Sequence, residues 1–120
     1  MIEEFRFEGE DYAPVFKSDT WLVALLRYSE RFSKATVLER HLETDEVFVL
    51  LSGEATLYTE DESRVMRKNT VYNIPKGVWH HIVVRPDATV LVAENSNTTK
   101  ENSEKRPWHP KEETACSQVN

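Results

Sequence analysis

Cysteine is almost absent from this chain of 120 residues, which contains only Cys116. A single cysteine excludes an internal disulfide and is typical of proteins from a reducing cytoplasm. Long apolar runs are also missing, because no stretch approaches the roughly 18 apolar residues of a membrane-spanning helix. The acidic start, followed by no apolar segment, predicts that the chain carries no secretory signal. We therefore expect a cytoplasmic protein that does not enter a membrane.

Basic clusters are missing as well. The net charge is −6, and the densest basic stretch consists of Arg64, Arg67 and Lys68, next to three acidic residues. Binding to a phosphate backbone requires a basic patch, so nucleic acid is excluded as an expected partner.

Only three glycines occur, and the expected turns use serine, aspartate, asparagine and proline instead. Between these turns lie short apolar or alternating runs that are typical of strands, whereas no convincing amphipathic helix appears. The run at 21–28 is apolar throughout, which predicts a strand buried on both faces. The expected strands are 21–28, 35–41, 47–51, 55–59, 64–67, 71–74, 80–84 and 89–93.

Closely spaced short strands predict an all-β fold, an antiparallel sandwich or barrel, in one domain over residues 1–95. The composition changes at this point. Residues 96–120 are rich in Asn, Ser, Thr, Lys and Glu and have few aliphatic side chains. This composition predicts a polar C-terminal tail that is disordered or loosely packed.

Four side chains capable of binding a metal lie close to expected strand ends: Glu39, His41, Glu46 and His80. Residues two apart in a strand point to the same face, so Glu39 and His41 are expected to project together. Imidazole and carboxylate are the usual ligands of zinc, iron, nickel and manganese. The pattern therefore predicts one divalent metal ion inside the barrel, although water in a polar pocket could also satisfy these groups.

The spacing of these residues resembles the two motifs of the cupin family. His41, Glu46 and Gly53 follow the first motif, and Pro75, Gly77 and His80 follow the second. The resemblance covers residues 33–94 and implies a small single-domain cupin, an antiparallel jelly-roll β-barrel. It also implies that the motif residues hold one divalent metal, which we expect to be iron, manganese, zinc or nickel.

The chain departs from the cupin pattern at Glu39, which replaces the first histidine of the family's His-x-His. Ser33, Asn69 and Val84 are further departures, at turn positions and at the end of the second motif. Glu39 is therefore expected to be either a fourth metal ligand or a carboxylate beside the metal that acts as a general base.

Other chemically active residues are not expected at the site. His81 follows His80 and so points to the opposite face of the strand, while His109 and Cys116 lie in the expected tail. Phe48 has the parity of Glu46, so we expect it to line the barrel beside the site.

Three functions are compatible with these features. The first is a small metal-dependent enzyme acting on a polar metabolite, by oxygen or Lewis-acid chemistry. The alternative is a non-catalytic module that binds or senses a small, sugar-like molecule, and the third is a scaffold with a vestigial site. Catalytic residues and the substrate are not assigned by the sequence. We also expect a homodimer formed by an outward apolar patch of Leu38, Leu42 and Trp79.

Overall fold

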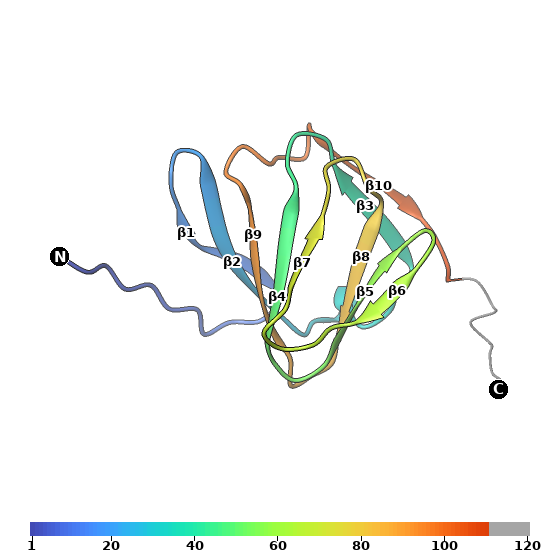
Figure 1. Ribbon diagram of the computed structural model, residues 1–120, viewed down its shortest axis with the longest axis horizontal. Coiled ribbons are helices and arrows are strands. Elements are labelled where there is room, and N and C mark those ends of the chain that lie inside the picture. Colours follow the sequence, from blue (N-terminus) through green and yellow to red (C-terminus); the bar gives the residue numbers. More distant parts are fainter. Residues whose placement is uncertain (111–120) are drawn as a thin grey trace.

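The structure is a computed structural model that describes residues 1–110 and contains ten β-strands and no α-helix in this range. A single turn of 3-10 helix, η1 (Glu30–Phe32), links two of the strands. The strands form two five-stranded antiparallel sheets (Figure 1). Sheet A contains, in spatial order, β1 (Tyr12–Lys17), β2 (Trp21–Arg27), β9 (Thr89–Asn95), β4 (Glu46–Ser52) and β7 (Val71–Ile74). Sheet B contains β10 (Ser103–Pro107), β3 (Val37–His41), β8 (His80–Val84), β5 (Ala55–Thr59) and β6 (Ser63–Val65).

The order of the strands confirms the expected jelly-roll barrel. Strands distant in sequence pair in both sheets: β9 lies between β2 and β4, and β8 lies between β3 and β5. Alternate residues of each strand point inward, and the two inner faces meet in one core. This core includes Leu22, Leu26, Phe48, Leu50, Leu57, Ile82, Val84, Val90 and Val92.

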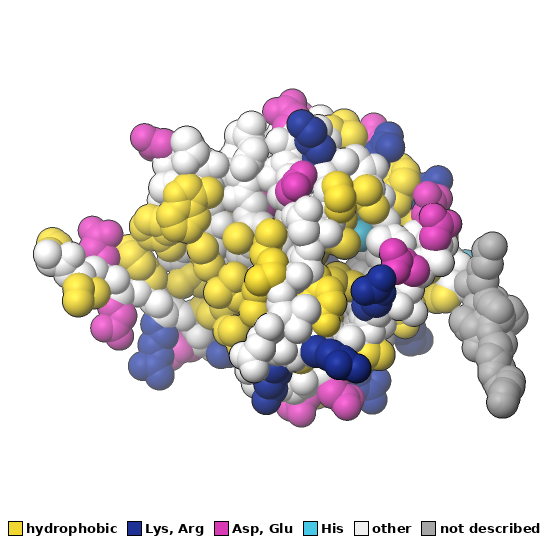
Figure 2. Space-filling view, viewed as in Figure 1, with side chains coloured by type: hydrophobic (Ala, Val, Ile, Leu, Met, Phe, Trp, Pro, Cys, Tyr) yellow, Lys and Arg dark blue, Asp and Glu magenta, His cyan; other side chains and the backbone are white. Residues whose placement is uncertain are grey.

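Sheet A is apolar on its outer face as well as its inner face, as the run at 21–28 predicted. Across β2, β9 and β4, Leu25 pairs with Leu91, and Leu91 pairs with Val49. These side chains are only half-buried. Figure 2 shows apolar side chains gathered over these strands. The outward residues are Val23, Leu25, Val47, Val49, Val71, Leu91 and Ala93.

The prediction of a disordered or loosely packed tail over residues 96–120 is wrong for residues 103–107. Ser103–Pro107 form β10, which pairs with β3 and extends sheet B, so the ordered fold continues beyond residue 95. This strand is hard to predict, because SEKRP has no apolar alternation and β10 is an edge strand whose side chains are largely solvated. Strand β1 was also not expected. Cys116 lies outside the described residues.

The predicted outward apolar patch is also wrong. Leu38 is fully buried, and Trp79 lies between two guanidinium groups, those of Arg40 and Arg106, each 4.6 Å from its ring. Both arginines pair with carboxylates, Arg40 with Glu104 and Arg106 with Glu60. This part of sheet B is therefore covered by charge, and Leu42 alone of the three predicted residues is an exposed apolar side chain.

None of the elements in residues 1–110 is a helix with the length and apolarity needed to cross a membrane.

Two glycines in turns offer a matched test of the packing. Gly53 and Gly77 both have positive φ, 73° and 83°. A Cβ on Gly53 would lie 2.6 Å from the Cα of Ala88, whereas a Cβ on Gly77 would meet no atom within 4 Å. We expect Gly77→Ala to lower the free energy of unfolding by about 1–2 kcal/mol, the cost of a left-handed alanine. Gly53→Ala should cost at least about 2 kcal/mol more, because the backbone of the 85–88 turn must move. Urea denaturation measures both, and equal losses would contradict this account.

Candidate metal centre

The side chains of His41, Glu46 and His80 converge at one end of the barrel. Glu46 comes from sheet A, and the two histidines come from neighbouring strands of sheet B. The Nε2 atoms of His41 and His80 lie 3.1 and 2.9 Å from the same oxygen, Oε1 of Glu46. All three residues are buried, and one ligand atom from each lies within 4.8 Å of the others.

Local structure places the two histidines. The turn before β8 contains Gly77, whose N–H donates to the carbonyl of His41 at 2.7 Å and so ties the start of β8 to the end of β3. The turn is also held from sheet A, because the carboxylate of Asp45 accepts hydrogen bonds from the N–H of Lys76 and the amide of Asn73. The second motif and the residue before Glu46 thus form one supporting structure.

The other ring nitrogen of each imidazole, Nδ1, also has a hydrogen-bond partner. Nδ1 of His41 lies 2.8 Å from the hydroxyl of Ser103 on β10, and Nδ1 of His80 lies 3.0 Å from the carbonyl of Val78. A carbonyl only accepts, so Nδ1 of His80 carries a proton. In neutral His80, a bare Nε2 would then face the carboxylate of Glu46. The contact becomes favourable when a proton lies between Nε2 and the carboxyl group, or when a metal ion is bound by both.

The acidity of these groups reflects the same contacts. Burial would raise the pKa of Glu46, but hydrogen bonds from His41 and His80 outweigh it and hold that pKa at about 2. Burial opposes charge on His41, yet the hydrogen bond and charge of Glu46 raise the pKa of His41 above its ordinary value. Glu46 and His41 therefore each favour the charged form of the other.

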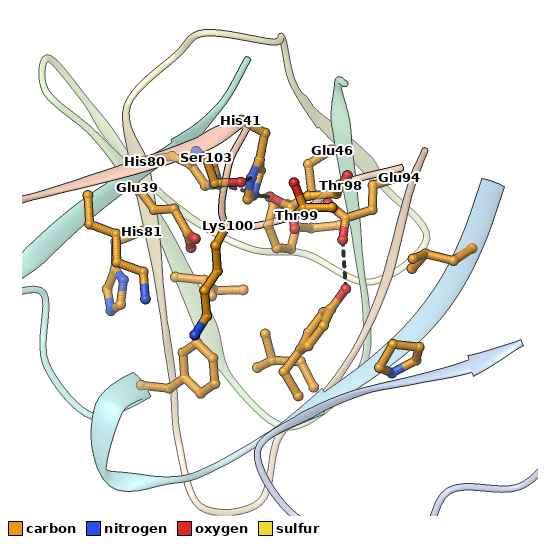
Figure 3. Close-up of a pocket in the computed structure, with 18 of the residues that line it drawn as sticks. Glu39, His41, Glu46, His80, His81, Glu94, Thr98, Thr99, Lys100 and Ser103 are labelled. Carbon is orange, nitrogen blue, oxygen red and sulfur yellow. Dashed lines mark hydrogen bonds and ion pairs between the residues drawn. The ribbon is translucent and has the colours of Figure 1, made fainter. Parts of the chain in front are cut away.

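Glu39 lies beside this cluster and outside it. It is the register partner of His80 in the β3–β8 pair and lines the cavity, but it is not among the three residues whose ligand atoms converge. Figure 3 shows its carboxylate pointing into the cavity. Phe48 lines the cavity as expected, with its ring 6.0 Å from that of His80.

His81 was expected to point away from the site, but it is buried and lines the same cavity as His80. The centroid of its ring lies 6.2 Å from that of Phe32 in η1, and the two rings are stacked. Next to them, β3 and β8 share a single register pair, Glu39 with His80. Burial lowers the pKa of His81 below its ordinary value. His109 is exposed and takes no part in the cluster.

The cavity has a volume of about 500 Å³, and sequence reasoning missed several of its residues. Glu94 of β9 is the register partner of Glu46, and its Oε2 accepts a hydrogen bond from the hydroxyl of Tyr12 at 2.7 Å. Burial, followed by the charge of Glu46, raises the pKa of Glu94. The parity of Val90, Val92 and Glu94 was the signal that could have identified this wall.

These features define a class of protein: a small all-β barrel with a histidine–carboxylate cluster in its cavity. The sequence profile of the cupin domain matches residues 31–93, and the chain belongs to the cupin family. No curated protein matches the chain.

Solved structures share the fold at low sequence identity. A cupin-2 domain protein from Shewanella frigidimarina is 20% identical, with a TM-score of 0.62 over 74% of this chain and 84% of that chain. KdgF from Halomonas sp. is 13% identical, with a TM-score of 0.60 over 82% and 90% of the two chains. Pac13, a nucleoside dehydratase that was also solved from Streptomyces with uridine, is 8% identical, with a TM-score of 0.66 over 88% and 86%. These neighbours of the same fold thus include an enzyme, and one of them was solved with a small molecule, uridine.

The pKa values predict how stability depends on pH in protein stripped of metal. A raised pKa of His41 stabilises the fold below the ordinary pKa of about 6.5, and this contribution is lost as the pH rises through the raised value. His81, whose pKa is lowered, has the opposite sign. We therefore compare metal-free wild type with Glu46→Gln by urea denaturation between about pH 6 and 8. The stability advantage of wild type should shrink as the pH rises, and a constant difference would contradict the charge pairing.

Proposed function

We propose that this chain binds one divalent metal ion through His41, Glu46 and His80, and that it is a small metal-dependent enzyme acting on a polar metabolite in the cytoplasm. The observation that carries the proposal is the contact between Nε2 of His80 and Glu46, at 2.9 Å, with Nδ1 committed to a backbone carbonyl. A metal ion at this position would be coordinated by Nε2 and by the carboxylate, in place of the proton that otherwise joins them.

The spacing of the donor atoms fits such an ion. Ligands at about 2.1 Å from a metal and at right angles to one another lie about 3 Å apart. The two nitrogen–oxygen separations here are 3.1 and 2.9 Å. Two histidines and one carboxylate suit iron, manganese, zinc or nickel and leave positions for substrate. Glu39 is proposed as the fourth ligand or as a base beside the metal.

Groups that handle protons surround the proposed centre and favour turnover over simple binding. A bound metal would supply Lewis-acid stabilisation of developing negative charge. Glu39 on one wall and Glu94 with Tyr12 on another are the carboxyl groups proposed to move a proton to or from a substrate carbon or oxygen, and burial raises the pKa of Glu94. Isomerisation and elimination are reactions of this kind. A non-catalytic binding protein is the second candidate, and an activity screen with and without metal separates the two.

The metal proposal is tested by elemental analysis of protein purified without chelators. Wild type should contain nearly one metal ion per chain, and His80→Ala should lose most of it, because a missing imidazole removes one of three donors. His109→Ala is the matched control, since His109 is exposed and distant from the cluster, and it should retain full metal content. Folded wild type that neither retains nor takes up zinc, manganese, iron or nickel would refute the proposal.

We also propose that the protein is a homodimer, formed through the outer face of sheet A. The row Leu25, Leu91, Val49 and Val71 crosses four strands without a charged side chain. An apolar sheet face of this kind is normally covered, and a second copy offers an identical uncharged face.

Aromatic residues extend this face beyond β1. The ring of Phe5, in the N-terminal segment, lies 5.4 Å from that of Phe16, which lies 5.3 Å from that of Trp21. Phe5 and Trp21 are exposed, as are Met1 and Ile2. In Figure 1 the N-terminal segment extends away from the barrel on the side of β1, where a facing copy could cover it.

Two matched valines test the dimer. Val71 on the proposed interface is 68% exposed and Val65 on sheet B is 71% exposed, both in short edge strands. We expect Val71→Asp to weaken the dimer at least tenfold, because it places a charge in an apolar interface, whereas Val65→Asp should not. Light scattering over a concentration series measures this. Monomeric wild type at all concentrations, or equal effects of both variants, would contradict the proposed face.

A further inference from the structure

The cavity has a polar wall formed by sheet A whose hydrogen bonding is incomplete. Oε2 of Glu94 accepts from Tyr12, but Oε1 is buried and, among residues 1–110, has no partner. A buried carboxyl oxygen without a partner is costly, whether or not the carboxyl is protonated. Glu94 lines the cavity, so its carboxyl group is the acceptor on this wall beside which a ligand hydroxyl group can lie.

The opposite side and the mouth of the cavity carry lysines. Lys105 comes from β10, where it is the register partner of Glu39, and Lys100 comes from the connection between β9 and β10. Lys17 of β1 also lines the cavity. Within the described part of the chain, none of these three lysines forms an ion pair. Figure 3 shows Lys100 pointing into the cavity, while Glu39 and Glu94 lie on opposite sides of the histidine cluster.

The connection that carries Lys100 is held in place. Thr99 donates its N–H to the side chain of Asn102, which in turn donates to the carbonyl of Asn97. Asn97 is tied to Glu43 beyond the end of β3. The ammonium group of Lys100 is thus presented over the cavity by a braced segment, and preorganisation of this kind lowers the cost of binding an anion.

We infer that the ligand of this cavity is a small hydroxylated anion, whose charged group lies against Lys100 and Lys105 and whose hydroxyl group lies against Glu94. The inference rests on the proposed small-molecule site and names its ligand class. The lysines without ion pairs supply the positive charge that neutralises the bound anion. The carboxyl group of Glu94, which has hydrogen-bonding capacity left, favours a ligand that also carries a hydroxyl group. A carboxylate and a phosphate satisfy the lysines equally, so both belong to the class.

Matched probes test this inference by calorimetry. D-Gluconate and D-glucitol 6-phosphate share the carbon skeleton of neutral D-glucitol, and glycolate is compared in the same way with ethylene glycol. We expect saturable binding of at least one anion, with an affinity at least tenfold above that of its neutral counterpart. Preference for gluconate or for the phosphate identifies the anionic group. Equal binding of neutral and charged partners, or binding of none at high millimolar concentration, overturns the inference.

Variants identify the residues responsible. Lys100→Ala should weaken anion binding roughly tenfold, the usual effect of losing one charge-assisted contact, and Lys100→Arg should restore most of it. Lys68→Ala, which alters an exposed lysine of the 68–70 turn that does not line the cavity, should change nothing. Glu94→Gln should weaken gluconate and glucitol alike. Unchanged affinity in Lys100→Ala would refute the assignment.

Metal content is measured on the same samples, with and without chelator. Anion binding that depends on Lys100 but persists in metal-free protein supports this inference even if the metal proposal fails. Metal binding without any anion preference supports the metal proposal and overturns this inference.

Discussion

The burial of Glu46 is the constraint on which the rest of the structure depends. Its carboxylate belongs to sheet A but is contacted by two imidazoles of sheet B, so one polar cluster spans the two layers of the barrel. A carboxylate this deeply buried is tolerated only with partners of opposite charge. Those partners must be placed accurately, and the hydrogen bonds around Gly77, Asp45 and Ser103 do this.

The two ends of the barrel have different roles, one in the stability of the fold and the other in the proposed binding site. One end is filled by aliphatic side chains such as Leu57, Val84 and Val90. The burial of these side chains away from water holds the two sheets together. The other end holds acidic residues, histidines and lysines around an open volume. Hydrophobic stabilisation at the filled end offsets the cost of leaving polar groups incompletely satisfied at the open end, a common arrangement in binding sites.

The sequence predicted most of the strands that contribute inward-facing core side chains, because these strands have strong apolar patterns. Two-residue parity placed Glu39 and His41 on one face, and motif spacing identified Glu46 and His80. Parity predicted that His81 points away from the site, but it could not show that η1 covers His81, which is buried and lines the same cavity. Parity and motif spacing could not identify Ser103 and Lys105, because β10 has the composition of a solvated segment. They also could not identify Lys100, which lies in the connection before β10. The place of β10 in sheet B follows from the exposed edge of β3, and pairing with that edge uses backbone groups that any sequence provides.

The contact between Ser103 and His41 has a consequence for the order in which the protein matures. The two residues are 62 positions apart, and β10 is the last strand of the described chain. Because synthesis runs from the N-terminus, the connection carrying Lys100 and Ser103 of β10 are made after the other nine strands of the described chain. The hydroxyl partner of His41 and the two lysines proposed to bind an anion, Lys100 and Lys105, are therefore the last parts of the cavity to be synthesised.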